Sequence, residues 1–145
     1  MPNSGRSSPR PRYARVRRLD GRLVGRLVEL YRAAGWWYRG DTPAMLRRLV
    51  CGSHCFLVVK DRGRVIGMGR AISDRASDAY IQDIFVEEAY RGRGIGAEIV
   101  RRLARELAAD KVRWIGLIAV PGSRSFYEKL GFSLMRRFEP MLLKD

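Results

Sequence analysis

The residues best suited to chemistry form one short segment rich in glycine and arginine, residues 91–96, with the sequence RGRGIG. A predicted strand ends just before this segment, and a predicted helix follows it at once. Glycines let a backbone turn sharply and bring its N–H groups close to a ligand. The first turn of a helix adds unpaired N–H donors and a partial positive charge, and two arginines add full charges. The segment therefore predicts an anion site, with phosphate or pyrophosphate as its natural occupant.

Two other phosphate-binding patterns fit the segment less well. The spacing Gly92-x-Gly94-x-x-Ala97 matches the relaxed dinucleotide-binding pattern, but several predicted strands precede it, and the next strand ends at Val120 without an acidic residue. No G-x-x-x-x-G-K-[ST] sequence occurs anywhere in the chain, so a P-loop is excluded. A glycine-rich turn that binds nothing is the structural alternative.

Hydrophobic periodicity predicts the elements that position this segment. Apolar residues three or four apart predict helices over 22–35, 92–110 and 123–130, and Asp41 or Thr42 is placed to cap another helix that starts at Pro43 and ends near Gly52. Alternating or continuous apolar runs predict strands over 13–19, 54–60, 64–72, 77–86, 113–120, 132–138 and 141–143. The run over 113–120 is almost entirely apolar, which favours burial on both faces. The order β-α-α-β-β-β-α-β-α-β-β indicates a mixed α/β (α+β) domain around one central sheet.

Length and composition fit one globular domain. The chain has 145 residues, 46% of them hydrophobic and 30% charged, as is typical of a folded protein. We expect a disordered basic tail over residues 1–12 and a single domain over residues 13–145. The longest run without a charged residue, Leu49 to Val59, is too short to span a bilayer, and no apolar stretch follows the basic N-terminal residues. We therefore expect a soluble, cytoplasmic protein without a membrane partner.

The formal net charge of +14 is high. Such a surplus attracts nucleic acid, acidic membrane surfaces or a polyphosphate cofactor, although a solvated surface rich in arginine gives the same charge. No RNA-binding or zinc-finger signature is present, so a nucleic-acid-binding module is the less favoured function. Cys51, His54 and Cys55 are too few soft ligands for a structural zinc, so we expect no metal and two buried thiols.

Two motifs resemble the GNAT superfamily of acyl-CoA-dependent N-acetyltransferases. Arg91-x-x-Gly94-x-Gly96 matches the family signature [RQ]-x-x-G-x-[GA], and residues 125–132 (SFYEKLGF) resemble the family's FYEKLGF element further along the chain. The resemblance covers roughly residues 13–143. It implies a mixed, largely antiparallel central sheet flanked by about four helices, and an N-acetyltransferase that uses acetyl-CoA as its acetyl donor.

The resemblance also implies where coenzyme A binds. Its pyrophosphate is expected on the glycine loop and the first helical turn after it, and its pantetheine arm on the backbone of the preceding strand. That strand splays from the strand over 113–120, and a bulge commonly opens such a gap. Many relatives have an asparagine where this chain has Val120, so Ser123 is a candidate to supply the missing contact. The implied cofactor-binding residues are Ile84, Phe85, Val86, Arg91, Gly92, Arg93, Gly94, Ile95, Gly96, Ala97 and Ser123.

The implied chemistry is direct attack of an amine on the thioester. Tyr127 matches the family's general acid for the thiolate, and a phenol with an ordinary pKa of about 10 stays protonated at neutral pH. A free backbone N–H on the splayed strand, at Phe85 or Val86, would stabilise the oxyanion. The amine must first lose a proton, and Asp83 is the first choice of base. A carboxylate bonded to backbone or to a neighbouring arginine is the structural alternative, and the other routes are Glu87, Glu88 or a water chain.

The sequence leaves the acceptor open. Trp36, Trp37 and Tyr38 follow the first helix, where the resemblance places a loop that shapes the acceptor pocket. These aromatic residues either hold an apolar or cationic amine or plug the core. A small amine, a peptide N-terminus and a lysine side chain all fit, and the oligomeric state, including a homodimer, also stays open. A catalytically silent domain that only binds acyl-CoA is the main alternative function.

Overall fold

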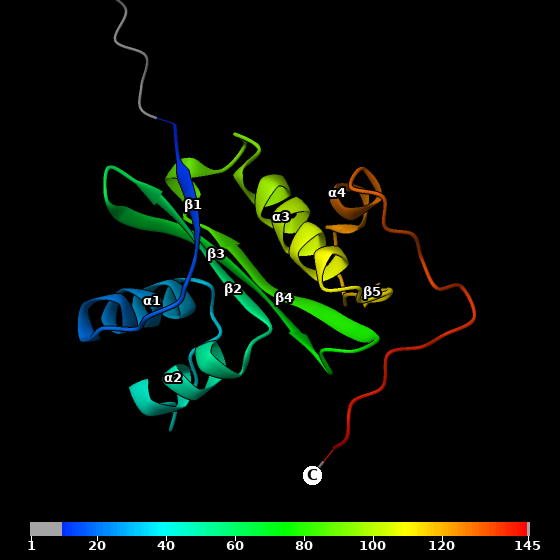
Figure 1. The fold of residues 1–145 in the computed structure, drawn as a ribbon, viewed down its shortest axis with the longest axis horizontal. Coiled ribbons are helices and arrows are strands. Elements are labelled where there is room, and N and C mark those ends of the chain that lie inside the picture. The colour runs from blue at the N-terminus through cyan, green and yellow to red at the C-terminus, as the bar shows by residue number, and fades with distance from the viewer. Residues whose placement is uncertain (1–9, 145) are drawn as a thin grey trace, which may run out of the picture.

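A computed structural model describes residues 10–144 of the chain (Figure 1). In this part of the chain the elements are β1 (Arg12–Arg15), α1 (Gly21–Ala33), α2 (Pro43–Gly52), β2 (Cys55–Asp61), β3 (Arg64–Ser73), β4 (Asp78–Val86), the 3₁₀ turn η1 (Glu88–Tyr90), α3 (Ile95–Ala109), β5 (Trp114–Gly116) and α4 (Arg124–Glu128). Apart from η1, their order matches the sequence prediction as far as α4. The predicted mixed α/β fold is therefore confirmed.

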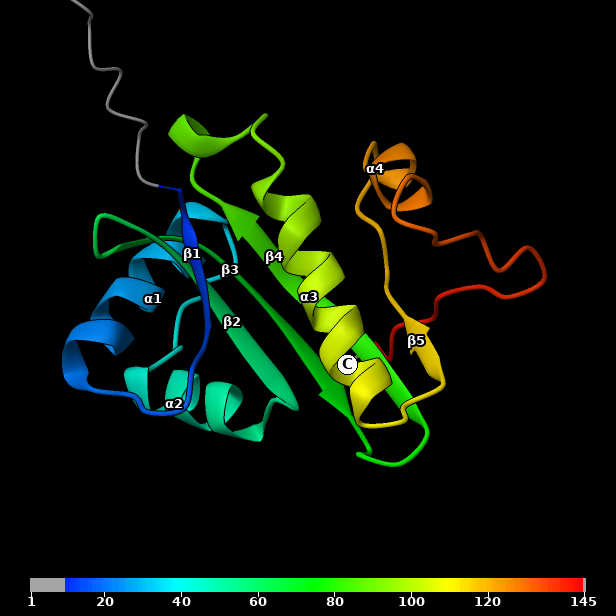
Figure 2. The same cartoon turned by 45° about the horizontal axis from the view of Figure 1, so that its top comes forward.

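The strands form one sheet, and helices cover both of its faces. The sheet has five strands in the order β1-β2-β3-β4-β5. Neighbouring strands run antiparallel, except that β5 runs parallel to β4. Figures 1 and 2 show α1 and α2 on one face of the sheet, α3 across the other face, and α4 beside α3. This layering buries both faces of the central strands.

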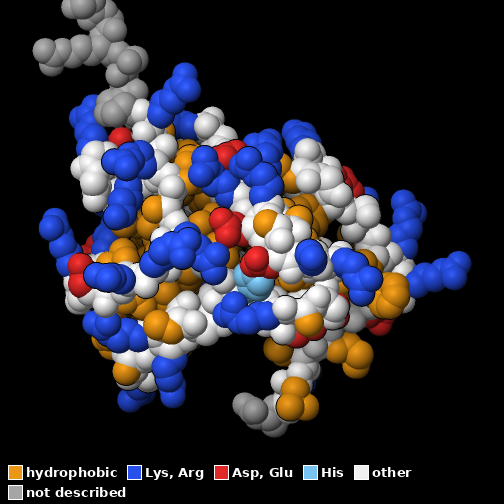
Figure 3. Space-filling view, in the orientation of Figure 1, with side chains coloured by type: hydrophobic (Ala, Val, Ile, Leu, Met, Phe, Trp, Pro, Cys, Tyr) orange, Lys and Arg blue, Asp and Glu red, His pale blue; other side chains and the backbone are white. Residues whose placement is uncertain are grey.

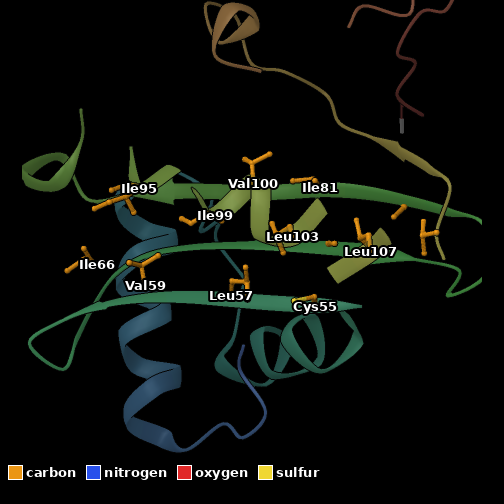
Figure 4. Packing of buried hydrophobic residues seen from close by; sticks show 14 residues of the cluster. Cys55, Leu57, Val59, Ile66, Ile81, Ile95, Ile99, Val100, Leu103 and Leu107 are labelled. Carbon is orange, nitrogen blue, oxygen red and sulfur yellow. The ribbon is translucent and has the colours of Figure 1, made fainter. Parts of the chain in front are cut away.

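Two hydrophobic cores form, one on each face of the sheet. In β2, Cys55, Leu57 and Val59 pack with α3, whereas Phe56 and Val58 pack with α1 and α2. All five side chains are buried, which explains why the strand is apolar at both alternating sets of positions. Burial of an aliphatic side chain contributes about 1.5–3 kcal/mol. α3 contributes a row of aliphatic side chains to the core that contains Leu57. Figure 4 shows them: Ile95, Ile99, Leu103 and Leu107.

Local capping determines where the first two helices start. Asp20 accepts a hydrogen bond from the Leu23 N–H at 2.7 Å ahead of α1, and Thr42 accepts one from the Met45 N–H at 3.2 Å ahead of α2. Pro43 occupies the first helical position, where its missing N–H has no partner to lose. Of the two caps predicted for α2, Thr42 is therefore the one that acts.

β4 contains a bulge at Asp83. The pairing with β3 shifts between Met68 and Arg70, whose partners in β4 are Phe85 and Gln82. One residue of β3 therefore lies opposite two residues of β4, which defines a β-bulge. Asp83 has a φ of 56°, in the left-handed region that residues with a side chain rarely adopt.

The bulge reverses the alternation of side chains along β4. Before it, Ala79 and Ile81 pack in the core under α3. After it, Ile84 and Val86 face that core, and Phe85 packs in the opposite core with α1 and α2. In a regular strand Phe85 would share the face of Ile81, because residues two apart point to the same side. The bulge therefore decides which groups the end of β4 presents to each face.

The strands predicted over 132–138 and 141–143 are wrong, because no strand forms within residues 132–144. The apolar residues of this segment alternate as in a strand, but among the described residues no neighbouring strand pairs with it. Phe138 instead donates its N–H to the Met135 carbonyl in a turn, and the segment runs away from the sheet and back (Figure 2). Phe132 is partly buried against the core. The apolar side chains after it are exposed, namely Leu134, Met135, Phe138, Met141, Leu142 and Leu143.

The strand predicted over 113–120 is present only as the three residues of β5, and its burial on both faces is wrong. Trp114 is 37% exposed, Ile118 is 72% exposed and Val120 is 63% exposed. The pairing with β4 ends at Gly116, and in the described part of the chain no strand follows β5 in the sheet. The apolar run beyond Gly116 therefore meets solvent.

The predicted tail over residues 1–12 lies outside the described residues except for its last three, and Arg12 already belongs to β1. In the part of the chain that the structure describes, none of the helices has the length and apolar character needed to cross a membrane.

Cys55 is buried, and this burial raises the pKa of its thiol to about 11. Cys51 is exposed on α2, which corrects the expectation of two buried thiols.

The close packing at the bulge yields a stability prediction. Gly69→Ala should lower the free energy of unfolding by about 1–3 kcal/mol, because a Cβ at Gly69 would lie 2.5 Å from Cγ2 of Ile99 and 2.6 Å from Cδ1 of Ile84. The control is Gly25→Ala in α1, where nothing lies within 4 Å of the added Cβ; this change should raise the free energy of unfolding by about 0.5–1 kcal/mol. Urea unfolding followed by circular dichroism measures both. Effects of the same sign and size would contradict the packing argument.

Candidate functional site

The glycine loop predicted from the sequence lies between the end of β4 and the start of α3. Gly92 and Gly94 have φ angles of 73° and 79°, so the loop uses the backbone freedom of both glycines. Gly94 directly precedes α3 and provides no side-chain cap. The first N–H groups of α3 therefore have no side-chain cap, and the anion site predicted there stays a prediction.

Two exposed arginines flank this loop. Nε of Arg91 donates a hydrogen bond to the Val86 carbonyl at 2.9 Å, and its guanidinium lies 5.5 Å from the centre of the Phe85 ring. Arg93 donates a hydrogen bond to the Ala89 carbonyl at 3.1 Å. Backbone carbonyls thus hold both side chains beside the loop, where their charges add to the positive end of α3.

α4 packs against the same loop. A Cβ added at Gly96 would lie 3.6 Å from Cζ of Phe126 and 3.9 Å from Cγ2 of Val86, so β4, α3 and α4 meet at this point. Tyr127 packs edge-to-face on Phe126 and on Phe132, with ring centres 4.9 Å and 5.9 Å away. Burial raises the pKa of Tyr127, which keeps its hydroxyl protonated at neutral pH.

β4 extends beyond the strand beside it. β5 pairs only with Asp78–Tyr80, whereas β4 continues to Val86. Among residues 10–144, the stretch Ile84–Val86 therefore has no strand partner on its β5 side, and backbone groups on a free strand edge can pair with a ligand. Ser123, directly ahead of α4, donates its hydroxyl hydrogen to the Val120 carbonyl at 2.7 Å.

Two donors hold Asp83, the first choice of base. Nε of Arg70 and the hydroxyl of Tyr31 both donate to Oδ2 of Asp83, at 2.5 Å and 2.7 Å. The side chains of Arg70 and Asp83 are only 14% and 19% exposed. Burial and the negative charge of Asp83 raise the pKa of Tyr31 far above its ordinary value, so Tyr31 remains a donor. Asp83 is thus the arginine-bonded carboxylate that the sequence analysis left as the alternative.

Glu87, at the exit of β4, is also ion-paired. Arg26 of α1 and Arg64 of β3 both donate to Oε1 of Glu87, Arg64 at 3.0 Å. The Glu87 side chain is 19% exposed, whereas Glu88 is exposed. Arg26 also donates to the Val65 carbonyl at 2.9 Å. This network fastens the end of β4 to α1 and to β3.

The sequence analysis missed the partners of both carboxylates. Arg70 is the only charged residue of the segment 65–72, and Tyr31 lies on the apolar stripe of α1. A polar or charged side chain among buried residues needs a hydrogen-bond partner. The position of Arg70 and Tyr31 within apolar segments could therefore have indicated that each of them has one. Nothing in the spacing identifies the partner, because Tyr31 is 52 residues away from Asp83.

The three aromatic residues after α1 have different surroundings. Trp36 packs edge-on against Phe85 and Tyr31, with ring centres 6.2 Å and 6.3 Å away. Trp37 is partly buried against the same core, and Tyr38 is 67% exposed. The structure therefore brings Trp36 to the end of β4 and leaves Tyr38 in solvent.

The residues considered for a metal have other roles. His54 is buried, and its ring nitrogens lie 2.5 Å from Oγ of Ser73 and 2.6 Å from Oδ2 of Asp110. It thereby joins the start of β2 to the end of α3. Within residues 10–144, no three His, Cys, Asp or Glu side chains gather into a group that could hold a metal ion.

A comparison with protein families decides the class of this fold and site. Residues 52–134 match the model of the acetyltransferase (GNAT) domain. The chain belongs to the GNAT family. The matched residues run from the end of α2 past α4, so they include the bulged strand, the glycine loop and the helix of Tyr127.

Several relatives in the GNAT family are similar to this chain. GCN5-related N-acetyltransferase 2 (chloroplastic) of Arabidopsis thaliana is 41% identical over 69 residues, which are 48% of this chain and 27% of that protein. Serotonin N-acetyltransferase 2 (chloroplastic) of Oryza sativa is 30% identical over 126 residues, 84% of this chain and 62% of that protein. The chain therefore spans less than two thirds of the length of either relative. A protein from Clostridium acetobutylicum, described as a predicted acetyltransferase and solved with acetyl-CoA, shares the fold with a TM-score of 0.72 at 18% identity. The match covers 92% of this chain and 96% of that chain.

Proposed function

We propose that this GNAT protein transfers the acetyl group of acetyl-CoA to a primary amine. One observation carries the proposal: the uncapped start of α3, the free edge of β4 and the helix of Tyr127 lie against one another. A helix N-terminus suits a diphosphate, a free strand edge suits the amide groups of a pantetheine arm, and a protonated phenol suits a thiolate leaving group. Acetyl-CoA carries all three of these chemical groups.

The glycine loop fits the diphosphate of coenzyme A in charge and in shape. Gly92 and Gly94 let the backbone turn toward the ligand. The N–H groups of Ile95, Gly96 and Ala97 are the free donors of the first turn of α3. Arg91 and Arg93 supply positive charge beside them, and we propose that Ser123 contributes a further polar contact. The acetyl-CoA bound to the Clostridium acetobutylicum protein of the same fold supports this assignment.

We propose a direct transfer without a covalent enzyme intermediate. The neutral amine nitrogen attacks the thioester carbon, the C–N bond forms, and the C–S bond then breaks. The backbone N–H of Val86 on the free edge of β4 stabilises the oxyanion. The N–H of Phe85 is directed at β3 instead, because Glu87 donates its N–H to the Ile66 carbonyl and alternate N–H groups of a strand point to the same side. Tyr127 gives its proton to the departing sulfur and regains one from solvent. The amine proton passes to water, because the negative charge of Asp83 is already bonded to Arg70 and Tyr31. The base role of Asp83 stays a prediction, which the substitutions proposed below for Asp83 decide.

We propose that Trp36, Trp37 and Tyr38 bind the acceptor amine. Trp36 lies against Phe85, which directly precedes Val86 at the free edge of β4. Aromatic faces favour apolar groups and cations, so an arylalkyl amine fits this surface well. The name of the Oryza sativa relative specifies such an amine, serotonin.

Measurements of acetyl-CoA binding and of thiol release with amines distinguish the proposed acetyltransferase from the alternative functions. A silent acyl-CoA-binding domain would bind acetyl-CoA yet release no thiol with any amine. A nucleic-acid-binding module would show steeply salt-dependent binding to DNA or RNA. Figure 3 shows Lys and Arg side chains spread over the visible face rather than gathered in one stripe, so this face shows no docking track for nucleic acid.

Substituting the glycine ahead of α3 tests the cofactor site. Gly94→Ala should weaken acetyl-CoA binding about tenfold, because a Cβ is strained at a φ of 79° and the N–H groups of α3 would turn away. Calorimetry in moderate salt measures the Kd. Gly63→Ala is the matched control, since Gly63 has a φ of 81° in the turn after β2 and equally open surroundings. It should strain its turn but leave the Kd unchanged. Absence of saturable acetyl-CoA binding by the wild-type protein would overturn the proposed function.

Removing one hydroxyl tests the general acid. Tyr127→Phe should lower kcat about a hundredfold or more while leaving the Kd for acetyl-CoA unchanged. A general acid works below its pKa, and burial raises the pKa of Tyr127. The wild-type rate should therefore show no loss from Tyr127 until the pH exceeds about 10. Tyr13→Phe in β1 is the control, because burial raises the pKa of that phenol too. Full turnover by Tyr127→Phe at every pH would exclude the acid role.

A further inference from the structure

We propose that Asp83 is a positioning residue, held by Arg70 and Tyr31 in the left-handed conformation that creates the bulge of β4. We name these three residues the Asp83 clamp. Through the bulge, the clamp orients the backbone N–H groups of Ile84 and Val86 toward the thioester. This inference rests on the proposed acetyl transfer and adds Arg70 and Tyr31 to the residues on which that transfer depends.

The clamp acts at the point where the alternation of β4 breaks. Arg70 donates from Nη2 to Oε1 of Gln82 at 3.2 Å and from Nε to Oδ2 of Asp83 at 2.5 Å. Gln82 and Asp83 therefore present their side chains to the same face, which a regular strand does not allow. Tyr31 adds a third hydrogen bond, from α1. One guanidinium thus spans the two residues that lie on either side of the break.

A clamp is needed because the bulge is unfavourable by itself. A residue with a Cβ resists a φ of 56°, although aspartate tolerates this region better than most residues. Hydrogen bonds between charged partners are stronger than neutral ones, and shielding from water strengthens them further. The Arg70 side chain is 14% exposed and Tyr31 is 4% exposed. The two bonds to Asp83 therefore offset the conformational cost.

The same geometry argues against proton transfer to Asp83. Both donors point at Oδ2, so a proton on that oxygen would displace a hydrogen bond, and a proton on Oδ1 would weaken both bonds by removing the negative charge. Neutralising the carboxylate would also leave the shielded guanidinium of Arg70 without its counter-charge. A base at this position would thus have to loosen the bulge in every turnover.

Substitutions at Asp83 separate the two roles. Glycine adopts positive φ without strain, so Asp83→Gly should keep the bulge and retain a kcat about tenfold above that of Asp83→Ala. A general base would make both variants equally inactive, because both lack the carboxylate; equal kcat values would overturn the proposal. Arg62 is the control, with a φ of 48° in the turn after β2. Arg62→Gly and Arg62→Ala should differ in stability but not in kcat.

The clamp also predicts that its members act as a unit. Arg70→Met should lower kcat about tenfold in the wild-type background, but much less in the Asp83→Gly background, where no clamp is needed. Equal losses in both backgrounds would overturn the proposal. Tyr31→Phe removes a single hydroxyl and should lower kcat in the same way, but by less. If Arg70→Met fails to fold, Tyr31→Phe replaces it in the comparison between the wild-type and Asp83→Gly backgrounds.

A binding control distinguishes failure of this inference from failure of the proposed function. Coenzyme A should bind the Asp83→Gly variant with the wild-type Kd, because this variant keeps both the bulge of β4 and the diphosphate site on the glycine loop. If the wild-type protein binds neither coenzyme A nor acetyl-CoA, the proposed function fails. The clamp is then still tested by NMR of the ligand-free protein. Asp83→Ala should shift the amide resonances of residues 84–86 and Asp83→Gly should shift them much less, and equally large shifts would overturn the proposal.

Discussion

The break in the alternation of β4 at Asp83 is the constraint on which the rest of the site depends. In a regular strand, every second side chain points to the same face. Phe85, four residues after Ile81, would then share the face of Ile81 and enter the core under α3. The extra residue sends Phe85 to the side of Trp36 and leaves Val86 beneath α3. Gly69 makes this arrangement sterically feasible, because any side chain at that position would collide with Ile84 and Ile99. The conformation of one aspartate thus connects a packing requirement to the groups that β4 presents at its free edge.

Most of the polar side chains around β4 restrain the backbone of this strand, and few of them are free to react. Arg70 and Tyr31 restrain the bulge, Arg26 and Arg64 restrain the strand exit through Glu87, and Arg91 returns to the carbonyl of Val86. This pattern suits acyl transfer by direct attack, because such a reaction draws mainly on oriented N–H donors and a single proton donor. Tyr127 is the side chain in this neighbourhood whose pKa and burial suit proton donation.

The sequence predicted the parts of this protein that follow from local patterns. The apolar stripe of α3, the cap at Thr42 and the glycine loop depend on residues close together in the chain, and all were placed correctly. The C-terminal strands failed because alternation alone does not provide a neighbouring strand, and β5 is too short to offer one. The pairing of Asp83 with Tyr31 and Arg70 depends on tertiary contacts between distant segments. A bulge was expected near this strand, yet its position follows only from the register with β3.

Amide hydrogen exchange with and without acetyl-CoA tests the central claim most directly, because it reports the backbone groups to which the ligand binds. The account predicts slower exchange at the free edge of β4, Ile84–Val86, together with the first turn of α3, Ile95–Ala97. The contradictory result is protection elsewhere with both segments unchanged. The shallow hollow of about 440 Å³ between the outer face of α3 and Leu130 and Phe132 is the alternative location to examine.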